Sequence, residues 1–504
     1  MYSYAVKIAV IGAGAAAFGV LAGLRRFGPR DAEISLFDIG KELGPTPARV
    51  ESHGFDRVAV QGIYRQLRRG NRLAFPPPKS HFGETLAKLE VEDRRRLWKS
   101  EHRGGLTNIW GGGMFPFTDR ELAAWPIGAD DLDPHYQHIA EQVGVCGERD
   151  RLSAYFGRDY INRPPLETSP VIHKLIDTAN ATRLPGGHDY DIAGGSSRLA
   201  LETRPGRADR CTYLGECMLG CPRGAIWSAA TALDDYQRDG FFYYVRARVA
   251  AFDGRHLQLE RDGGVERAGP FDRIFVAAGC IGSTEIVMRS LGIEEGPRLL
   301  DNTVMSFPIL YSGPVPDGAG DGYFSLCNAS LAGIPRDPAG SFAQVSIYPS
   351  FDHLWRYYTP APMWSLLSRA WRLGRWRLLL GRVFLAGASN RSFSFRLRGG
   401  KLSIRPDAEP DVRAAAGSFM RSLRAAVNHN GFHVPPVPPG GHATSSHYAS
   451  TFPYGSQVVP DRSGRVAPGV YLADASTFVT APSISPTFTI MANACRTARE
   501  ALAD

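Results

Sequence analysis

The first apolar segment of the chain, KIAVIGAGAAAFGVLAGL, predicts a short strand that runs directly into a glycine-rich turn and a helix of small residues. Gly12, Gly14 and Ala17 occupy the small-residue positions of a G-x-G-x-x-G/A pattern. Such positions form the tight turn, let the backbone approach a pyrophosphate, and permit close helix packing. A second strand, EISLFDIG, ends in Asp38, where an acid would hydrogen-bond a ribose hydroxyl. The segment predicts a dinucleotide-binding unit, whereas the turn alone would fit any tight strand-to-helix connection.

The C-terminal part of the chain carries a second distinctive pattern. His447 opens the run HYASTFPYG, and a strand reading VYLADAS comes later. Ser485 and Pro486 then precede the apolar-periodic segment TFTIMANACRTARE, which we expect to be a helix. N–H groups at the start of such a helix would stabilise negative charge placed against them.

These segments together resemble the glucose-methanol-choline (GMC) family of FAD oxidoreductases, over most of the chain but sparsely in its middle. The resemblance implies an α/β fold in which a Rossmann-like FAD-binding domain is interleaved with an α+β substrate domain. The expected FAD-binding parts are 1–134, 206–300 (with the cysteine motif) and 441–504 (with the catalytic histidine), and the expected substrate parts are 135–205 and 301–440. No low-complexity linker separates these ranges, which favours interleaved over sequential domains.

Further segments match the family around the cofactor. RGGLTNIWGGG would pass close to the flavin ring and pyrophosphate, FDRIFVAAGC would supply a second strand and turn, and the hairpin YYVRARVAAFDGRHLQLERDGG would approach the adenine. Some relatives attach the flavin through a histidine just before the tryptophan. Ile109 occupies that position, so we expect noncovalent FAD. The cofactor-binding residues that the resemblance implies are Gly12, Gly14, Ala17, Asp38, Gly105, Thr107, Asn108, Val249, Gly279, Asp474, Ala475, Pro486 and Thr487.

The resemblance also implies a mechanism. In GMC enzymes a histidine accepts the proton of a hydroxyl group while hydride passes from the adjacent carbon to the flavin. His447 matches that histidine, and the earlier His442 is the alternative. The family's second His or Asn, just before the final proline, is Ser485 here, and a serine hydroxyl has no useful basicity near neutral pH. Ser485 would either orient the substrate hydroxyl or mark altered chemistry or an inactive flavoprotein.

Three cysteines form the sharpest local motif, in CTYLGECMLGCPRGA. Cys211, Cys217 and Cys221 occupy the first, third and fourth positions of the bacterial ferredoxin run C-x2-C-x2-C-x3-C-P, with Leu214 in the second. Three thiolates suit a [3Fe-4S] cluster. The spacing resembles the catalytic subunits of bacterial FAD-dependent sugar dehydrogenases, in which a cluster passes electrons to a cytochrome partner. The alternative is that these cysteines are small buried residues, while zinc would lack a fourth nearby ligand.

Composition bounds the remaining expectations. Seven cysteines, an odd number without even spacing, argue against a disulfide framework. No secretory signal precedes the first strand, so we expect a cytoplasmic protein, with export on a partner's signal as the alternative. The net charge of +8 fits a solvated basic surface, and no motif indicates nucleic-acid binding. Residues 362–390, dense in Trp, Leu and Arg, favour a helix that contacts a membrane surface peripherally or acts as a lid or partner-facing helix.

Three functional interpretations follow. The first is a dehydrogenase that oxidises a CH–OH group of a sugar, polyol or other alcohol and passes electrons, through the cluster, to a partner protein. The second is an oxidase that uses oxygen directly and has structural cysteines. The third, raised by Ser485, is a noncatalytic flavin-binding protein. The middle of the chain, which should line the pocket, leaves the substrate open, although the arginines favour anionic or lipid-linked glycans.

Overall fold

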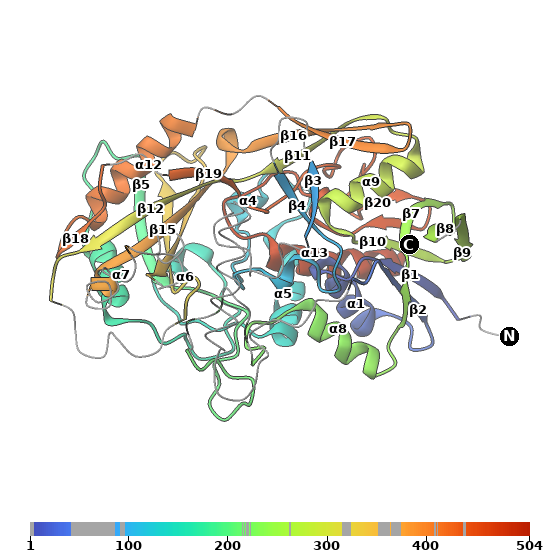
Figure 1. Ribbon diagram of the computed structural model, residues 1–504, viewed down its shortest axis with the longest axis horizontal. Helices are drawn as coiled ribbons and strands as arrows, with labels where there is room; N and C mark the ends of the chain where they lie inside the picture. Colours follow the sequence, from blue (N-terminus) through green and yellow to red (C-terminus); the bar gives the residue numbers. More distant parts are fainter. Residues whose placement is uncertain are drawn as a thin grey trace.

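The computed structural model describes residues 5–41, 86–90, 96–213, 223–261, 264–314, 324–350, 374–407, 412–436 and 440–504, together with single positions such as 215, 217, 221, 363 and 410. Two large sheets organise these residues. Figure 1 shows them at opposite ends of the long axis, with helix α13 (Thr487–Ala503) between them. Each sheet draws strands from segments far apart in the sequence.

The first sheet has six strands in the order β20-β21-β10-β1-β2-β6, parallel except where β20 pairs with β21. Its central strand is fully apolar after the first residue, as expected for a strand covered on both faces. Parallel strands end at a common edge, so the turns that follow β1, β2 and β10 meet there. The strands are β1 (Lys7–Ile11), β2 (Glu33–Asp38), β6 (Tyr243–Arg246), β10 (Arg273–Val276), β20 (Arg465–Ala467) and β21 (Val470–Leu472).

Helix α1 (Ala15–Phe27) packs closely against the C-terminal helix α13. A Cβ added at Gly19 would lie 2.4 Å from the carbonyl oxygen of Met491, and one at Gly23 would lie 2.8 Å from that of Cys495. The two glycines, four residues apart on one face of α1, therefore let the helix backbones approach each other directly. This contact holds together the first and last helices of the chain.

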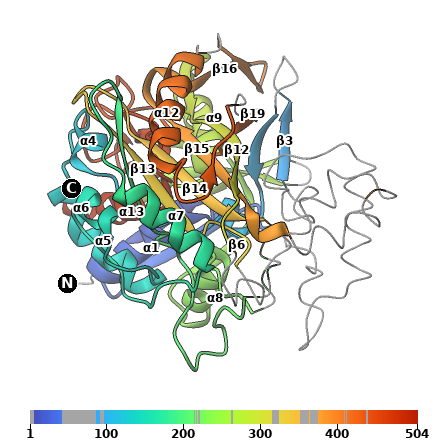
Figure 2. The same cartoon turned by 90° about the vertical axis from the view of Figure 1, so that its left-hand side faces the viewer.

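The second sheet is antiparallel and has the order β18-β12-β15-β14-β13-β5, with β19 also paired to β12. One face packs into an apolar core with helices α7 (Pro170–Ala181) and α12 (Val412–Val427), which cover it in Figure 2. Its strands are β5 (Tyr190–Ser196), β12 (Thr303–Tyr311), β13 (Ala329–Pro335), β14 (Ala343–Pro349), β15 (Leu378–Leu385), β18 (Phe432–His433) and β19 (Gly440–Thr444).

The helix expected across residues 362–390 is wrong for its second half, because Leu378–Leu385 is strand β15. This strand pairs with β12 on one side and β14 on the other. Backbone pairing on both edges, with Leu379, Val383 and Leu385 in the apolar core, outweighs the helical tendency of a Leu-rich and Arg-rich run. Residues 364–373 lie outside the described part of the chain.

Smaller elements connect the two sheets, and the predicted hairpin is confirmed as the antiparallel pair β7–β8. The whole confirms the predicted α/β fold, with a Rossmann-like unit interleaved with an α+β unit. No helix in the described ranges is long and apolar enough to cross a membrane. The other strands are β3 (Leu86–Glu90), β4 (Arg96–Ser100), β7 (Arg248–Asp253), β8 (His256–Arg261), β9 (Gly264–Ala268), β11 (Glu295–Asp301), β16 (Arg391–Arg398) and β17 (Lys401–Pro406). The other helices are α4 (Asp119–Leu122), α5 (Ala129–Val143), α6 (Arg151–Phe156), α8 (Ala229–Arg238) and α9 (Gly279–Leu291).

Candidate active site

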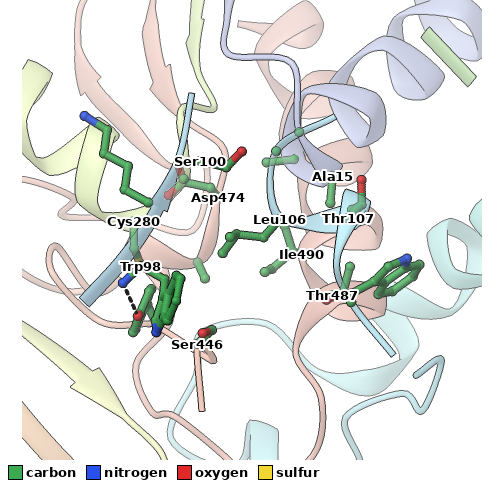
Figure 3. Close-up of a pocket in the computed structure, with 18 of the residues that line it drawn as sticks. Ala15, Trp98, Ser100, Leu106, Thr107, Cys280, Ser446, Asp474, Thr487 and Ile490 are labelled. Atoms are coloured by element: carbon green, nitrogen blue, oxygen red, sulfur yellow. Dashed lines mark hydrogen bonds between the residues drawn. The ribbon is translucent and has the colours of Figure 1, made fainter. Parts of the chain in front are cut away.

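A cavity of about 410 Å³ is lined by residues of both sheets. At one end it is bounded by the turns after β1, β2 and β10, and at the other by side chains of β13, β14 and β15. Figure 3 shows residues from separate segments of the chain around it, among them Trp98 on β4, Leu106 in a 3₁₀ turn and Ile490 on α13. The Trp98 N–H donates to the Tyr448 hydroxyl at 2.9 Å across this region. The cavity thus brings together parts of the chain that are far apart in the sequence.

Gly12 forms the turn at the end of β1. Its φ is +104°, and a Cβ there would lie 2.5 Å from the carbonyl oxygen of Ala277 at the end of β10. Its N–H donates to the Phe37 carbonyl oxygen at 2.7 Å, which ties the turn to β2. Only glycine fits a position with positive φ and so close a backbone neighbour. Gly12 therefore has the tight-turn role predicted for it, and it lines the cavity.

Two glycine turns meet at the N-terminus of helix α1. Gly14 is the N-cap of α1 and has no side-chain cap, and a Cβ added at Gly105, where φ is +57°, would lie 3.2 Å from the Gly14 Cα. The Gly104 N–H donates to the Ala13 carbonyl at 2.8 Å and fixes the contact. N–H groups at an uncapped helix start need an acceptor, and a phosphate is a suitable one. Both glycines border the cavity, so their backbone offers an anion cradle.

Thr107, Asn108 and Ala17 support this cradle from behind. The Thr107 hydroxyl accepts from the Ala229 N–H at 3.0 Å, and the Asn108 side chain accepts from the Ser228 hydroxyl at 2.8 Å. Both bonds hold the 3₁₀ turn Gly105–Asn108 against the start of α8. Thr107 borders the cavity, whereas Asn108 and the fully buried Ala17 do not lie among its lining residues. The structure therefore places Asn108 and Ala17 in supporting positions rather than at the cavity wall.

Asp38 lies in the cavity wall at the carboxyl end of β2. Burial raises the pKa of Asp38 to about 6, against the opposing effects of the Gly40 N–H at 2.9 Å, the Tyr244 hydroxyl at 3.5 Å and the positive charge of Arg103. A carboxylate desolvated in this way gains from a hydroxyl donor, such as that of a ribose. The place predicted for Asp38 at this strand end is the one observed.

Glu101 was not predicted and lies in the same cavity wall. It accepts hydrogen bonds from Lys41 and, at 2.6 Å, from Arg248. Burial alone would raise the pKa of Glu101, but these two cations lower it to about 2. Val249, which follows Arg248 on β7, lines the cavity too. Nothing local in the sequence marks Glu101, because its partners are 60 and 147 residues away.

Asp474, which comes shortly after β21, accepts hydrogen bonds from the first turns of helix α9. Its Oδ2 accepts from the Ser283 hydroxyl at 2.5 Å, and its Oδ1 accepts from the Ser476 N–H at 3.0 Å. Burial raises the pKa of Asp474 against these bonds and one from the Gly279 N–H. Gly279, at φ +75°, Asp474 and the following Ala475 all line the cavity. The second glycine turn and the C-terminal strand therefore meet at one point.

The N-terminus of α13 also faces the cavity. Ser485, Pro486 and Thr487 all line it, and Pro486 is the N-cap without a side-chain cap. A Cβ added at Gly113 would lie 3.4 Å from the Ser485 hydroxyl oxygen, so this hydroxyl sits beside the Gly113 backbone. A helix N-terminus at this place favours negative charge in the cavity.

His447 lies in the cavity wall and is held from behind by Asn302. Its Nδ1 is 3.1 Å from the Asn302 Oδ1, while the Asn302 amide nitrogen donates to the Ala481 carbonyl at 2.8 Å. Since Ala481 offers only an acceptor, it fixes the orientation of the amide and leaves Oδ1 toward the histidine. His447 must then carry its proton on Nδ1, which leaves the lone pair of the ring on Nε2.

The surroundings keep the His447 ring neutral. It stacks on Phe384 with ring centroids 5.0 Å apart and planes 12° apart. Burial, and then the positive charge of Arg382, lower the pKa of His447 to about 3. A neutral imidazole in a fixed tautomer can accept a proton. The side chain of the alternative, His442, lies outside the described part of the chain.

The three motif cysteines gather against one apolar cluster. Cys211 is buried in this cluster, and Cys217 and Cys221 pack against it. Burial raises the pKa of Cys211 to about 12. Across the residues that the structure describes, no group of three His, Cys, Asp or Glu side chains is arranged to hold a metal ion. The [3Fe-4S] prediction therefore gains no support, and the alternative of small buried residues fits Cys211, whereas Cys217 and Cys221 are only partly buried.

Comparison with solved structures gives full-length matches. Pyridoxine 4-oxidase from Mesorbium loti matches with a TM-score of 0.56 at 17% identity, over 98% of this chain and 99% of that one. An FAD-dependent oxidoreductase from Chaetomium thermophilum matches with a TM-score of 0.59 at 11% identity, over 97% and 98%. No protein-family model and no curated protein matches the chain. The chain therefore shares the overall fold of these two proteins, which includes a Rossmann-like domain.

Proposed function

We propose that the protein binds FAD noncovalently in this cavity and oxidises a CH–OH group of a sugar, polyol or other alcohol. The observation that carries the proposal is the Asn302–His447 pair, which holds a neutral imidazole in the wall of the same cavity as the glycine cradle. The fold of FAD-dependent oxidoreductases supports it. The name of one structural neighbour, pyridoxine 4-oxidase, also supports the proposal, because that protein is an oxidase by name.

The residues around the cavity fit the cofactor. The uncapped start of α1 at Gly14, with Gly105 against it, would hold the pyrophosphate, and Asp38 would accept from the ribose. Asp474 and the N-terminus of α13 would lie toward the flavin. Ile109 lines the cavity and offers no atom for a covalent attachment. When bound, FAD supplies a two-electron acceptor for hydride.

His447 would accept the hydroxyl proton on Nε2 as the substrate carbon loses hydride. Its low pKa means that the imidazole is not already protonated at neutral pH. Ser485 would orient the same hydroxyl by donating or accepting one hydrogen bond, and it has no basicity to replace the histidine. In this proposal one base and one positioning group act on the substrate.

We include no iron–sulfur cluster in the proposal, because the described cysteines offer no metal site. The electron acceptor is then either oxygen or a partner protein. Peroxide released under air would identify an oxidase. Turnover that needs an added electron carrier would identify a dehydrogenase with a separate acceptor.

The test uses two portions of the purified protein. Acid releases the cofactor from the first portion so that it can be identified and quantified. The second portion, left intact, is mixed anaerobically with pools of sugars, polyols and other alcohols. We expect stoichiometric FAD and bleaching of its visible absorbance by at least one pool. Stoichiometric FAD that no alcohol bleaches, while dithionite does, would refute the enzymatic part and favour a noncatalytic flavin-binding protein. Protein that binds no flavin would refute the whole proposal.

A further inference from the structure

His447 directly follows a residue in a rare backbone conformation. Ser446 has a φ of +64°, in the left-handed region that residues other than glycine seldom adopt, and it lines the cavity (Figure 3). Such a conformation costs about 1–3 kcal/mol and persists only where the surrounding structure holds it. The turn that carries His447 therefore needs bonds from another part of the chain.

The junction of β11 and β12 supplies these bonds. Leu300, near the end of β11, exchanges two backbone hydrogen bonds with Ala449, at 2.9 and 3.0 Å. On the other side, β12 pairs with β19, which ends just before the turn. Residues 445–448 therefore lie between two backbone pairings. Asp301 and Asn302, which join β11 to β12, make hydrogen bonds to this turn.

Asp301 binds Ser445 with both carboxylate oxygens. Its Oδ1 accepts from the Ser445 hydroxyl at 2.5 Å, and its Oδ2 accepts from the Ser445 N–H at 3.1 Å. The same Ser445 hydroxyl oxygen accepts from the His447 N–H at 2.9 Å. A charged carboxylate strengthens the first bond and turns the hydroxyl hydrogen toward itself, which leaves a lone pair for the His447 N–H. The charge of Asp301 thus acts on the main chain of His447 through one side chain.

Asp301 and Asn302 therefore hold two different parts of His447. Asn302 contacts the ring at Nδ1, whereas Asp301 acts through Ser445 on the backbone N–H. A general base needs a fixed position as well as a fixed tautomer, because a displacement of about 1 Å can slow a reaction about 10²-fold. The second of these requirements belongs to Asn302, and the first falls to Asp301.

The groups around Asp301 determine the pH range in which it is charged. Asp301 is fully buried, and burial raises its pKa to about 6 against the hydrogen bonds that it accepts and the charge of Arg391, its cross-strand neighbour on β16. Its charge also acts on Arg382 and Tyr448. Arginine stays protonated, burial raises the pKa of Tyr448, and the pKa of His447 is about 3. Of these groups, Asp301 is therefore the one whose charge changes between pH 5 and 7.

We propose that Asp301 is a positioning residue for the base, which holds the His447 backbone through Ser445 and keeps the site productive only while Asp301 is charged. This inference rests on the proposed function and adds the regulation of its site by acid. Because Oδ2 faces an N–H, a proton taken up by Asp301 goes to Oδ1 and is donated to the Ser445 hydroxyl oxygen. Ser445 then loses its acceptor and the charge-assisted bond. The turn at Ser446 loses support, and flavin reduction slows as the pH falls below about 6.

The first test follows the His447 backbone without turnover. FAD-loaded protein labelled with ¹⁵N-histidine is titrated from pH 8 to 5, and the His447 amide signal is identified by its absence from His447→Gln. We expect its chemical shift to move with a midpoint near pH 6 in the unaltered protein and to stay constant in Asp301→Asn, because an amide does not ionise. A constant shift in the unaltered protein, or equal movement in Asp301→Asn, would overturn the inference.

The second test measures the rate of flavin reduction against pH, with an alcohol found in the substrate screen. The unaltered protein should slow below about pH 6. Asp301→Asn, whose amide resembles the protonated acid, should be about 10- to 100-fold slower above pH 7 and independent of pH. The pKa of Asp38 is also about 6, so the assignment depends on the loss of this pH step in Asp301→Asn rather than on its midpoint.

Asp407→Asn is the matched control. Asp407 also accepts hydrogen bonds from two serine hydroxyls, those of Ser392 and Ser394, each at 2.6 Å, and it is not among the residues that line the cavity. This variant should keep both the rate and the pH step of the unaltered protein. Equal slowing in Asp407→Asn and Asp301→Asn would refute a specific role for Asp301.

Ser445→Ala removes the link itself, and thermal melting shows whether each variant is folded. It should be slowed like Asp301→Asn and depend less on pH. The double variant should be little slower than either single one, because both changes break the same chain of bonds. Effects that multiply in the double variant, or an unchanged pH step in either folded single variant, would overturn the inference. If Asp301→Asn does not fold, Ser445→Ala and the amide titration still test it.

The outcomes separate this inference from the proposed function. Flavin that no alcohol reduces, in a protein whose His447 amide titrates as expected, would refute the proposed function and leave the link from Asp301 to His447 intact. Reduction of the flavin by folded Asp301→Asn, at the rate of the unaltered protein across the pH range, would refute the inference and leave the proposed function intact.

Discussion

Replacing Asn302 by leucine should slow the reduction of the flavin while the protein stays folded. Leucine keeps the volume but removes the acceptor that lies 3.1 Å from the His447 Nδ1. A buried donor left without its acceptor costs about 1–3 kcal/mol. The ring escapes this cost by moving its proton to Nε2, which removes the Nε2 lone pair. The fraction of base-competent His447 then falls about 5- to 150-fold, by conversion of the same free energy.

The assay is anaerobic stopped-flow reduction of the bound flavin by an alcohol found in the substrate screen. Asn390→Leu is the matched control, because the Asn390 amide donates to the same Ala481 carbonyl at 2.9 Å. It should lose a similar amount of stability in a urea titration and keep its reduction rate. Histidine-ring ¹⁵N spectra should show Nδ1–H in the unaltered protein and a change in Asn302→Leu. Unchanged reduction in Asn302→Leu, or equal slowing in Asn390→Leu, would refute the tautomer assignment.

Three further outcomes are expected. The pKa of His447 is lowered to about 3 from an ordinary 6.5, so its full contribution to stability is present above pH 6.5 and is lost as the pH falls. The free energy of unfolding, measured in urea, should fall by about 2 kcal/mol from pH 6.5 to 5 in the unaltered protein but not in His447→Gln. An equal loss in that variant would contradict the assignment. Asp38→Ala should weaken FAD binding about 10- to 150-fold in a fluorescence titration, and affinity equal to that of the unaltered protein would exclude a ribose contact. Gly19→Ala should lower the unfolding free energy by about 1–3 kcal/mol, because its Cβ would meet the Met491 carbonyl at 2.4 Å, whereas Gly417→Ala on α12, with its nearest contact at 3.8 Å, should raise it or leave it unchanged.

The parts of the site encoded within short segments could be predicted from the sequence. Gly12, Gly14 and Asp38 lie within two strands and one turn, where residue type and spacing together determine the backbone path. The place of His447 at the cavity came from a family resemblance, and its role stays a prediction. Asn108 differs from these residues, because its side chain bonds to Ser228 and it is not among the residues that line the cavity, so its cofactor contact stays a prediction.

The residues that the sequence did not reveal depend on long-range pairing. Asn302 is 145 residues from His447, and the residues between them carry no pattern that links the two. Arg382 lies in a Leu-rich segment expected to be helical, and only the register of β14 against β15 turns it toward the cavity. A strand with alternating faces over residues 378–385 places Arg382 on the face opposite the apolar core, and this pattern would identify it as a buried cation. Helical periodicity and strand alternation are hard to separate in so short an apolar run.

The central claim is that His447 accepts the substrate proton while FAD is reduced, and one comparison tests it most directly. The FAD-loaded protein, His447→Gln and the surface control His429→Gln are each mixed anaerobically with the same reducing alcohol, and the first-order rate of flavin bleaching is measured. We expect His447→Gln to retain FAD and to be slowed about 10²- to 10⁴-fold, as for loss of a general base, while His429→Gln is unaffected. Bleaching by His447→Gln at the rate of the unaltered protein would contradict the claim.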